Sequence, residues 1–232
     1  GGLMECEERI PLGYIPAGST NDFANSLDIP KDMVKAASDI IEGKLYSCDV
    51  GMFNQGHFIY IAAFGIFTDV SYETDQHLKN VLGHLAYLLE GSRRIWNVPT
   101  YWIKVDANGR TFEGEYIYGM VTNARSVGGF KNLPGKDVQL DDGLFEVTLI
   151  KRPKNPIELN EIIASLLIAE DKTGLIDSFK TDRILIESNQ EIPWTLDGEY
   201  GGEHSFVRIE AQKHAMELVL NPETSPEALN AE

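Results

Sequence analysis

Apolar residues recur at helical spacing in two segments of the chain. Residues 31–42 and 76–95 each place most of their apolar side chains on one face, which predicts amphipathic helices. A third helix is predicted at 156–170, with Asn155 as its N-cap and Pro156 in its first turn. A shorter helix, opened by Asn21 or Asp22, is predicted just ahead of the first of these segments. Long stretches with a different pattern separate the helices.

In those stretches the residues follow the two-residue period of β-strands. Turn residues mark two hairpins, Asn54-Gln55-Gly56 and Asn108-Gly109, and the second suits a type I′ turn because both of its residues tolerate positive φ. The predicted strands are 45–53, 57–65, the two arms within 100–124, 144–151, 181–187, 205–210 and 216–220.

Taken in order, these elements predict a small α/β remnant at 1–44, a β-rich domain at 45–220 with two helical excursions, and a fraying acidic tail at 221–232. Antiparallel strands joined by hairpins favour a β-sandwich for the second domain. The strand-like residues 12–15 have no earlier strand to pair with, so we expect that the N-terminal part of the first domain is missing.

The charge balance excludes one broad class of partner. Lys and Arg number 20 against 36 Asp and Glu, a formal net charge of −16, and a surface that acidic repels nucleic acid. No apolar run approaches the roughly 20 residues of a membrane span, and the chain does not begin with a signal peptide, so a cytoplasmic protein is expected. Cys6 and Cys48 are expected to be free thiols, and the scattered histidines form no zinc motif.

The segment PAGSTNDFA, residues 16–24, combines a glycine turn with a helix start. Backbone N–H groups and the positive end of a helix dipole suit a phosphate group, and an acidic residue there would hold Mg²⁺. A turn that only caps a helix has the same local features.

A second segment, residues 137–147, gathers the carboxylates of Asp137, Asp141 and Asp142 beside Gly143. Carboxylate and carbonyl oxygens are the ligands of hard divalent cations, and glycine lets nearby carbonyls turn inward. The alternative is a plain turn.

A third segment, residues 194–203, places Glu199 directly after the pair Asp197-Gly198. Glycine-rich backbone can approach a ligand closely, and a carboxylate on such a turn can serve as a general base. Taken alone, this signal is weak.

Together the segments resemble the diacylglycerol kinase catalytic family of lipid kinases, most closely its soluble bacterial branch. The family motif Pro-x-Gly-Thr-x-Asn-Asp-Phe-Ala stands here as 16–24, followed by Leu-Asp-Asp-Gly at 140–143 and Asp-Gly-Glu at 197–199. Residues 71–87 are also similar to that branch. Ser19 stands where the family usually has Thr, and its hydroxyl can make the same contacts.

The resemblance implies a two-domain NAD kinase/diacylglycerol kinase-like fold and an ATP-dependent lipid kinase, with diacylglycerol as the first expected acceptor. Glu199 matches the family's proposed base, and Asp22 matches the acidic residue that orients the Mg²⁺–phosphate assembly. Gly18, Ser19 and Asn21 match the segment that contacts ATP.

The resemblance also implies a structural Mg²⁺ bound by the Gln139 carbonyl, the Asp142 carboxylate and the Leu144 carbonyl. The implied partners are ATP, a lipid substrate at the membrane surface and a second subunit in a homodimer. Such an enzyme would be cytoplasmic and would associate transiently with the inner membrane surface.

The chain departs from the family at its start. The Gly-Gly-Asp-Gly-Thr loop that binds ATP phosphates belongs some tens of residues before Pro11 and is not in this sequence, so we expect the chain as given to be inactive alone. Two alternatives stay open, a non-catalytic lipid-binding or dimerisation module and, more distantly, an NAD kinase-like enzyme. The residues encoded ahead of Gly1 distinguish the kinase from the module.

Overall fold

The structure is a computed structural model. It describes residues 2–6, 9–18, 21–66, 98–128, 137–168, 173–221 and 223. The helix predicted at 76–95 and the predicted ATP contact Ser19 lie outside these residues, as does most of the predicted tail.

Within the described residues, ten strands form one hydrogen-bonded sheet that short helices flank. The strands are β1 Leu12–Gly13, β2 Lys44–Phe53, β3 Gly56–Phe58, β4 Ile61–Gly65, β5 Tyr101–Ala107, β6 Arg110–Thr122, β7 Phe145–Lys151, β8 Ile176–Thr181, β9 Arg183–Leu196 and β10 Glu199–Leu220. The helices are a 3-10 helix at Gly2–Glu5, α1 Asp22–Ser26, α2 Met33–Ile41 and α4 Pro156–Ile168. The predicted β-rich class with few helices is confirmed.

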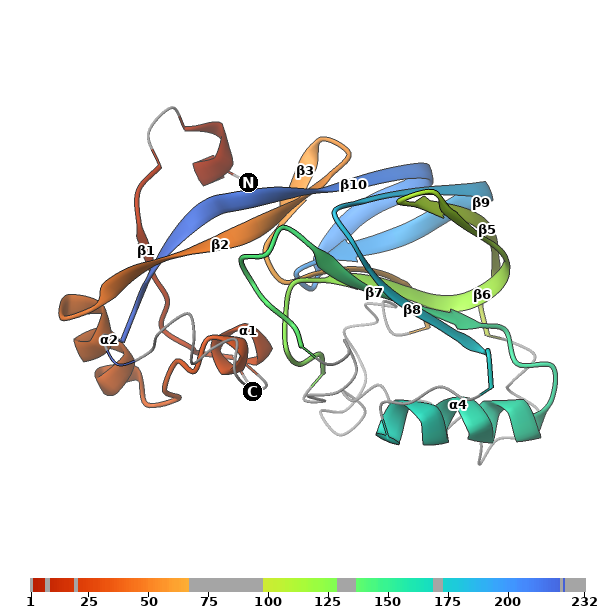
Figure 1. Cartoon of the computed structure of the whole chain (residues 1–232), viewed down its shortest axis with the longest axis horizontal. Helices are drawn as coiled ribbons and strands as arrows, with labels where there is room; N and C mark the ends of the chain where they lie inside the picture. The colour runs from red at the N-terminus through yellow and green to blue at the C-terminus, as the bar shows by residue number, and fades with distance from the viewer. Residues whose placement is uncertain are drawn as a thin grey trace.

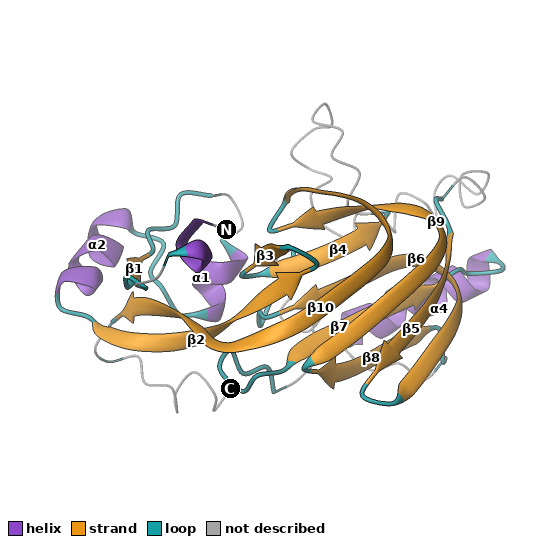
Figure 2. Ribbon diagram, turned by 90° about the horizontal axis from the view of Figure 1, so that it is seen from above, coloured by secondary structure: helices purple, strands orange, loops and turns teal. Residues whose placement is uncertain are grey.

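The sheet has the order β3-β2-β10-β9-β4-β6-β7-β8, with β1 beside β10 and β5 paired to both β6 and β9. The long strands β2 and β10 run antiparallel from the end that carries α1 and α2 to the curled end of the sheet (Figure 1, Figure 2). The strands thus belong to one continuous sheet rather than to the two sheets of the predicted sandwich. Register shifts in β10, such as the one between Gln212 and Met216, are irregularities of the kind that bend a strand.

Apolar side chains fill three clusters against this sheet. One lies within the curl and includes Trp194 and Phe145, and a second joins β4 and β6 to Leu159 and other residues of α4, which covers one face (Figure 1). The third cluster packs Leu27 of the α1 region against β2, β10 and Leu140. This third cluster fixes the N-terminal motif to the sheet.

Several local signals are confirmed. Asn108 and Gly109 have φ values of 51° and 77°, as a type I′ turn between β5 and β6 requires. Asn155 Oδ1 accepts the N–H groups of Ile157 and Glu158 and so caps α4.

Other strand predictions are wrong in detail. Residues 57–65 form two strands, because the backbone N–H groups between β3 and β4 bind a side chain from the turn after β9. The strands predicted at 205–210 and 216–220 are parts of the single strand β10, which continues through a bulge. The strand β8 has no counterpart among the predictions.

Two further expectations concern thiols and membrane spans. Cys6 and Cys48 are free, and burial raises the pKa of the Cys48 thiol to about 12. None of the helices in the described part of the chain combines the length and apolarity needed to cross a bilayer.

Candidate active site

One cavity gathers residues from two of the three motifs. It measures about 480 Å³ and is lined by Gly18, Asn21 and Asp22 of the N-terminal motif, by Tyr60, and by Asp197 of the turn between β9 and β10. Apolar side chains of β1 and β10 complete its wall. The segments that the resemblance assigns to ATP and to the acceptor therefore face the same space.

Asn21 closes the glycine turn instead of capping the helix. Its Oδ1 accepts the Gly18 N–H at 2.8 Å, and its Nδ2 donates to the Gly18 carbonyl at 2.6 Å. A Cβ at position 18 would lie 2.9 Å from Asn21 Oδ1, so the closure requires glycine. Asn21 precedes α1 with φ 55° and makes no side-chain cap, and the capping prediction for Asn21 is therefore wrong.

Asp22 opens α1 and is 8% exposed at the wall of the cavity. Its Oδ1 accepts the Ser126 hydroxyl at 2.7 Å, and the Tyr60 hydroxyl also hydrogen-bonds to its carboxylate. Burial, and then the nearby Asp22 charge, raise the pKa of Tyr60, so the phenol keeps its proton and donates it to this bond. Asp22 is thus held in one direction by two hydroxyls.

Asp197 forms the main link between the β9–β10 turn and the rest of the cavity wall. Its Oδ2 accepts the Ile59 N–H at 2.8 Å, and its Oδ1 accepts the N–H groups of Tyr60 at 2.8 Å and Ile61 at 3.0 Å. With φ 53° at Asp197 and 89° at Gly198, the pair is a tight two-residue hairpin turn. The sequence marks the turn but gives no sign that its carboxylate binds a segment far away in the chain.

Glu199, the predicted base, opens β10 with an exposed side chain. It lies two residues beyond Asp197 and is not among the residues that line the cavity. In contrast to Asp22 and Asp197, its carboxylate has no hydrogen bond or ion pair with the described residues. The structure therefore brings the turn to the cavity through Asp197 and leaves Glu199 at its outer edge.

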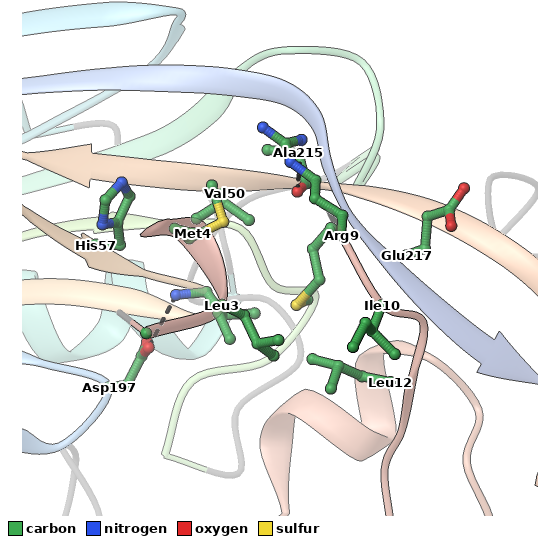
Figure 3. Close-up of a pocket in the computed structure, with 13 residues that line it drawn as sticks. Leu3, Met4, Arg9, Ile10, Leu12, Val50, His57, Asp197, Ala215 and Glu217 are labelled. Atoms are coloured by element: carbon green, nitrogen blue, oxygen red, sulfur yellow. Dashed lines mark hydrogen bonds between the residues drawn. The ribbon is translucent and has the colours of Figure 1, made fainter. Parts of the chain in front are cut away.

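A second cavity, of about 300 Å³ and also mainly apolar, shares four lining residues with the first: Leu12, Ile59, Asp197 and Met216. Leu3 and Ile10 contribute to its apolar wall, as Figure 3 shows. Asp197 and Glu217 lie on opposite sides of this view, and the Arg9 guanidinium between them donates to the Ala215 carbonyl at 2.7 Å (Figure 3). The two cavities meet at the Asp197 carboxylate.

The predicted metal residues lie on a separate acidic turn that leads into β7. Asp142 Oδ1 accepts the Leu144 N–H at 2.8 Å, and its Oδ2 lies 3.7 Å from Lys180 Nζ on β8. Lys180 also pairs with Glu146 Oε1 at 3.1 Å. Glu146 is 3% exposed, burial raises its pKa to about 7, and its Oε2 finds no hydrogen-bond partner among the described residues. Two carboxylates thus share a single ammonium group.

The backbone carbonyl oxygens of this turn fall into two groups, those that accept hydrogen bonds and those that do not. The carbonyls of Leu140, Asp141 and Asp142 accept hydrogen bonds from the protein, whereas no described residue donates to those of Gln139 and Leu144. No group of three or more His, Cys, Asp and Glu side chains that could hold a metal occurs in the described ranges. The Asp142 carboxylate and the open carbonyls of Gln139 and Leu144 are oxygen donors of the kind that a hard cation takes, and in this structure the Lys180 ammonium faces that carboxylate.

Asp49 of β2 is a buried carboxylate that the sequence analysis missed. Its two oxygens accept the backbone N–H groups of Gly143 and His214, and burial raises its pKa against the effect of these bonds. Asp49 thereby ties the acidic turn to β2 and β10. Its one signal in the sequence is a lone acidic residue inside an otherwise apolar strand.

The segment after β6 connects the acidic turn to the cavity. Asn123 Nδ2 donates to the carbonyls of Asp49 at 3.1 Å and Leu140 at 3.3 Å. Three residues later, Ser126 donates to Asp22. The cavity and the acidic turn therefore share one structural support.

Comparison with known proteins identifies the family. A sequence profile of the diacylglycerol kinase catalytic domain matches residues 1–53. The diacylglycerol kinase of Staphylococcus carnosus (strain TM300) is 34% identical over 214 residues, which are 92% of this chain and 69% of that protein. The chain belongs to the diacylglycerol kinase catalytic family.

Other diacylglycerol kinases support this assignment. That of Bacillus subtilis (strain 168) is 36% identical over 203 residues, 87% of this chain and 66% of that protein, so this chain spans less than two thirds of that relative. The crystal structure of a diacylglycerol kinase from Bacillus anthracis str. Sterne shares the fold with a TM-score of 0.69 at 22% identity, over 97% of this chain and 72% of the other. A second structure from that strain gives a TM-score of 0.76 at 26% identity with the same coverage. The resemblance to the soluble bacterial branch is confirmed.

Proposed function

We propose that the whole protein containing this chain is an ATP-dependent lipid kinase. It transfers the γ-phosphoryl group of ATP to a lipid hydroxyl, with diacylglycerol as the acceptor and phosphatidic acid as the product. The support from comparison is that the similar proteins are named diacylglycerol kinases.

The observation that carries the proposal is the division of roles among three carboxylates. Asp22 and Asp197 border one cavity with their oxygens engaged in hydrogen bonds, whereas the Glu199 carboxylate next to Asp197 is free of such bonds to the described residues. Phosphoryl transfer needs mainly positioning and charge neutralisation, together with one base to accept the hydroxyl proton. In this proposal Asp22 orients the nucleotide side, Asp197 fixes the acceptor turn, and Glu199 is the base.

The proposal also assigns the residues that contact ATP, Mg²⁺ and the lipid. Gly18, Ser19 and Asn21 contact ATP, and bound Mg²⁺ supplies positive charge to its phosphates. Gln139, Asp142 and Leu144 hold a second, structural Mg²⁺ on the acidic turn. The apolar cavity beside Asp197 favours a lipid over a polar acceptor. We expect a homodimer that contacts the inner membrane surface transiently.

Replacement of Glu199 by Gln tests the base in the whole protein. The substitution keeps the size of the side chain and removes the basic oxygen, so kcat should fall by about 10²–10⁴-fold while ATP affinity changes little. Glu203→Gln is the matched control, because Glu203 is another exposed glutamate of β10. Rates are measured in mixed micelles with saturating diacylglycerol and ATP. A Glu199→Gln protein that turns over at the wild-type rate rejects Glu199 as the base.

The second candidate is a non-catalytic lipid-binding module. The observation that favours it is the apolar cavity, which does not depend on a nucleotide. A wild-type whole protein that binds diacylglycerol micelles but hydrolyses and transfers no phosphate from labelled ATP would support the module and end the kinase proposal.

A further inference from the structure

Tyr60 lies between the two motifs that border the larger cavity. It occupies the break between β3 and β4, and its side chain lines the cavity together with Asp22 and Asp197. The sequence gives it no distinction, since it is one aromatic residue in a run of apolar ones. Its contacts in the folded chain set it apart.

The backbone of Tyr60 is held on both sides. Its N–H donates to Asp197 Oδ1 at 2.8 Å, so the residue is fixed to the turn that carries Glu199. Its carbonyl accepts the Thr122 hydroxyl at 2.7 Å and the Asn123 N–H at 3.0 Å. With three hydrogen bonds to two separate segments, the residue has a defined position relative to the sheet.

The side chain of Tyr60 reaches the other motif. Its hydroxyl hydrogen-bonds to the Asp22 carboxylate and receives the Gly128 N–H. Ser126, which donates to Asp22 Oδ1 at 2.7 Å, comes from the same segment as Gly128. One tyrosine therefore connects the acceptor-side turn through its backbone and the nucleotide-side acid through its hydroxyl.

We propose that Tyr60 is a positioning residue of the phosphoryl-transfer site, which keeps the Asp22 carboxylate at a fixed separation and direction from the turn bearing Glu199. The inference rests on the proposed function and adds a residue to it. A kinase must hold the nucleotide phosphates and the attacking hydroxyl in one line, and small displacements of such groups reduce rates steeply. Because Tyr60 contacts both Asp22 and the turn bearing Glu199, it can keep these two groups in alignment.

Tyr60→Phe isolates the hydroxyl, because phenylalanine keeps the ring and all three backbone hydrogen bonds. The chain offers a closely matched control in Tyr116, whose hydroxyl donates to Asp177 Oδ2 at 2.8 Å away from the cavity. Each substitution deletes one phenol–carboxylate hydrogen bond, and Tyr60→Phe also removes the acceptor of the Gly128 N–H, so its melting temperature should fall at least as far as that of Tyr116→Phe. A stability effect alone would therefore be shared by the two variants.

Catalysis should separate the variants in the whole protein. We expect kcat to fall about 10–100-fold in Tyr60→Phe and to stay within about twofold of wild type in Tyr116→Phe. Ser126→Ala, which deletes the other hydroxyl bond to Asp22, should lower kcat in the same direction while the KM for lipid stays within about twofold. This second variant keeps the inference testable if Tyr60→Phe folds poorly.

The outcomes distinguish the inference from the proposed function. Wild-type protein without lipid kinase activity rejects the function, and the inference with it. An active wild type with folded Tyr60→Phe and Tyr116→Phe proteins that turn over equally overturns the positioning role alone. So does a loss in Tyr60→Phe that appears only as a higher lipid KM, since the hydroxyl would then act on the lipid rather than on Asp22.

Discussion

The clearest structural prediction concerns the Asp197 carboxylate. Three consecutive backbone N–H groups, those of Ile59, Tyr60 and Ile61, donate to its two oxygens. In the break between β3 and β4 these bonds take the place of hydrogen bonds to a neighbouring strand. Asp197→Asn is the appropriate perturbation, because asparagine tolerates the φ of 53° at this position. The amide NH₂ must stand where one carboxylate oxygen stood, so at least one N–H loses its acceptor.

The magnitude follows from the kind of bond that is lost. A hydrogen bond to a charged group contributes about 1.5–3 kcal/mol, and we take a value of about 2 kcal/mol because Asp197 is exposed. For a chain of this length each kcal/mol corresponds to about 2–4 °C, so the melting temperature should fall by about 4–8 °C. Asp106→Asn is the control, because it removes the same charge from an exposed position on β5. It should change the free energy of unfolding by less than about 0.5 kcal/mol.

Hydrogen exchange provides the local assay. The amides of Ile59, Tyr60 and Ile61 should exchange faster in Asp197→Asn than in wild type, while amides in the centre of β6 and β7 change little. Urea unfolding gives the global stability from the midpoint, provided that the m value is unchanged. Wild-type protection at residues 59–61 in the variant would refute the reasoning, because another acceptor would then be serving these groups.

Two further predictions concern packing and charge. Lys180→Met leaves the buried Glu146 without its cation and should lower the free energy of unfolding by about 2 kcal/mol, less than for a fully buried pair because the lysine side chain is 32% exposed. Added Mg²⁺ should raise the melting temperature of this variant more than that of wild type. A variant whose melting temperature does not respond to Mg²⁺ would count against a cation site on the turn. Gly51→Ala should lower the free energy of unfolding in urea by about 1–3 kcal/mol, because the new Cβ would lie 2.2 Å from the Phe58 ring. Gly56→Ala, whose Cβ would lie 3.5 Å from the nearest atom, should leave that free energy nearly unchanged. Equal effects of the two substitutions would contradict the packing between β2 and β3.

The sequence predicts those parts of the fold that neighbouring residues decide. The Asn108-Gly109 turn and the Asn155 cap are confirmed because their geometry depends on φ preferences and on bonds that span two or three residues. The break in residues 57–65 was not predictable in this way, since Asp197 lies 138 residues from Ile59 in the sequence. The continuity of β10 through its bulge likewise depends on pairing with β2, which local periodicity does not report.

The same distinction applies to the candidate site. The motif residues Gly18, Asn21 and Asp22 were singled out from the sequence, and the structure brings them to one cavity. Tyr60 and Asp49 were not, because each belongs to an apolar strand pattern and gains its significance only from partners elsewhere in the chain. Glu199, Gln139, Asp142 and Leu144 stay predictions in their assigned roles.

The separation of these partners in the sequence has a consequence for how the site forms. Ser126 and Asp22 are 104 residues apart, Tyr60 and Asp197 are 137 apart, and His214 and Asp49 are 165 apart. Pairing within the sheet brings such distant segments together: β4 pairs with β9 beside Asp197, and β2 pairs with β10 beside Asp49 and His214. Each motif in isolation is therefore only a turn, as its local features alone indicated. Its chemistry depends on the completed sheet, so a substitution that opens the β2–β10 pairing should disable the site even though every motif residue is still present.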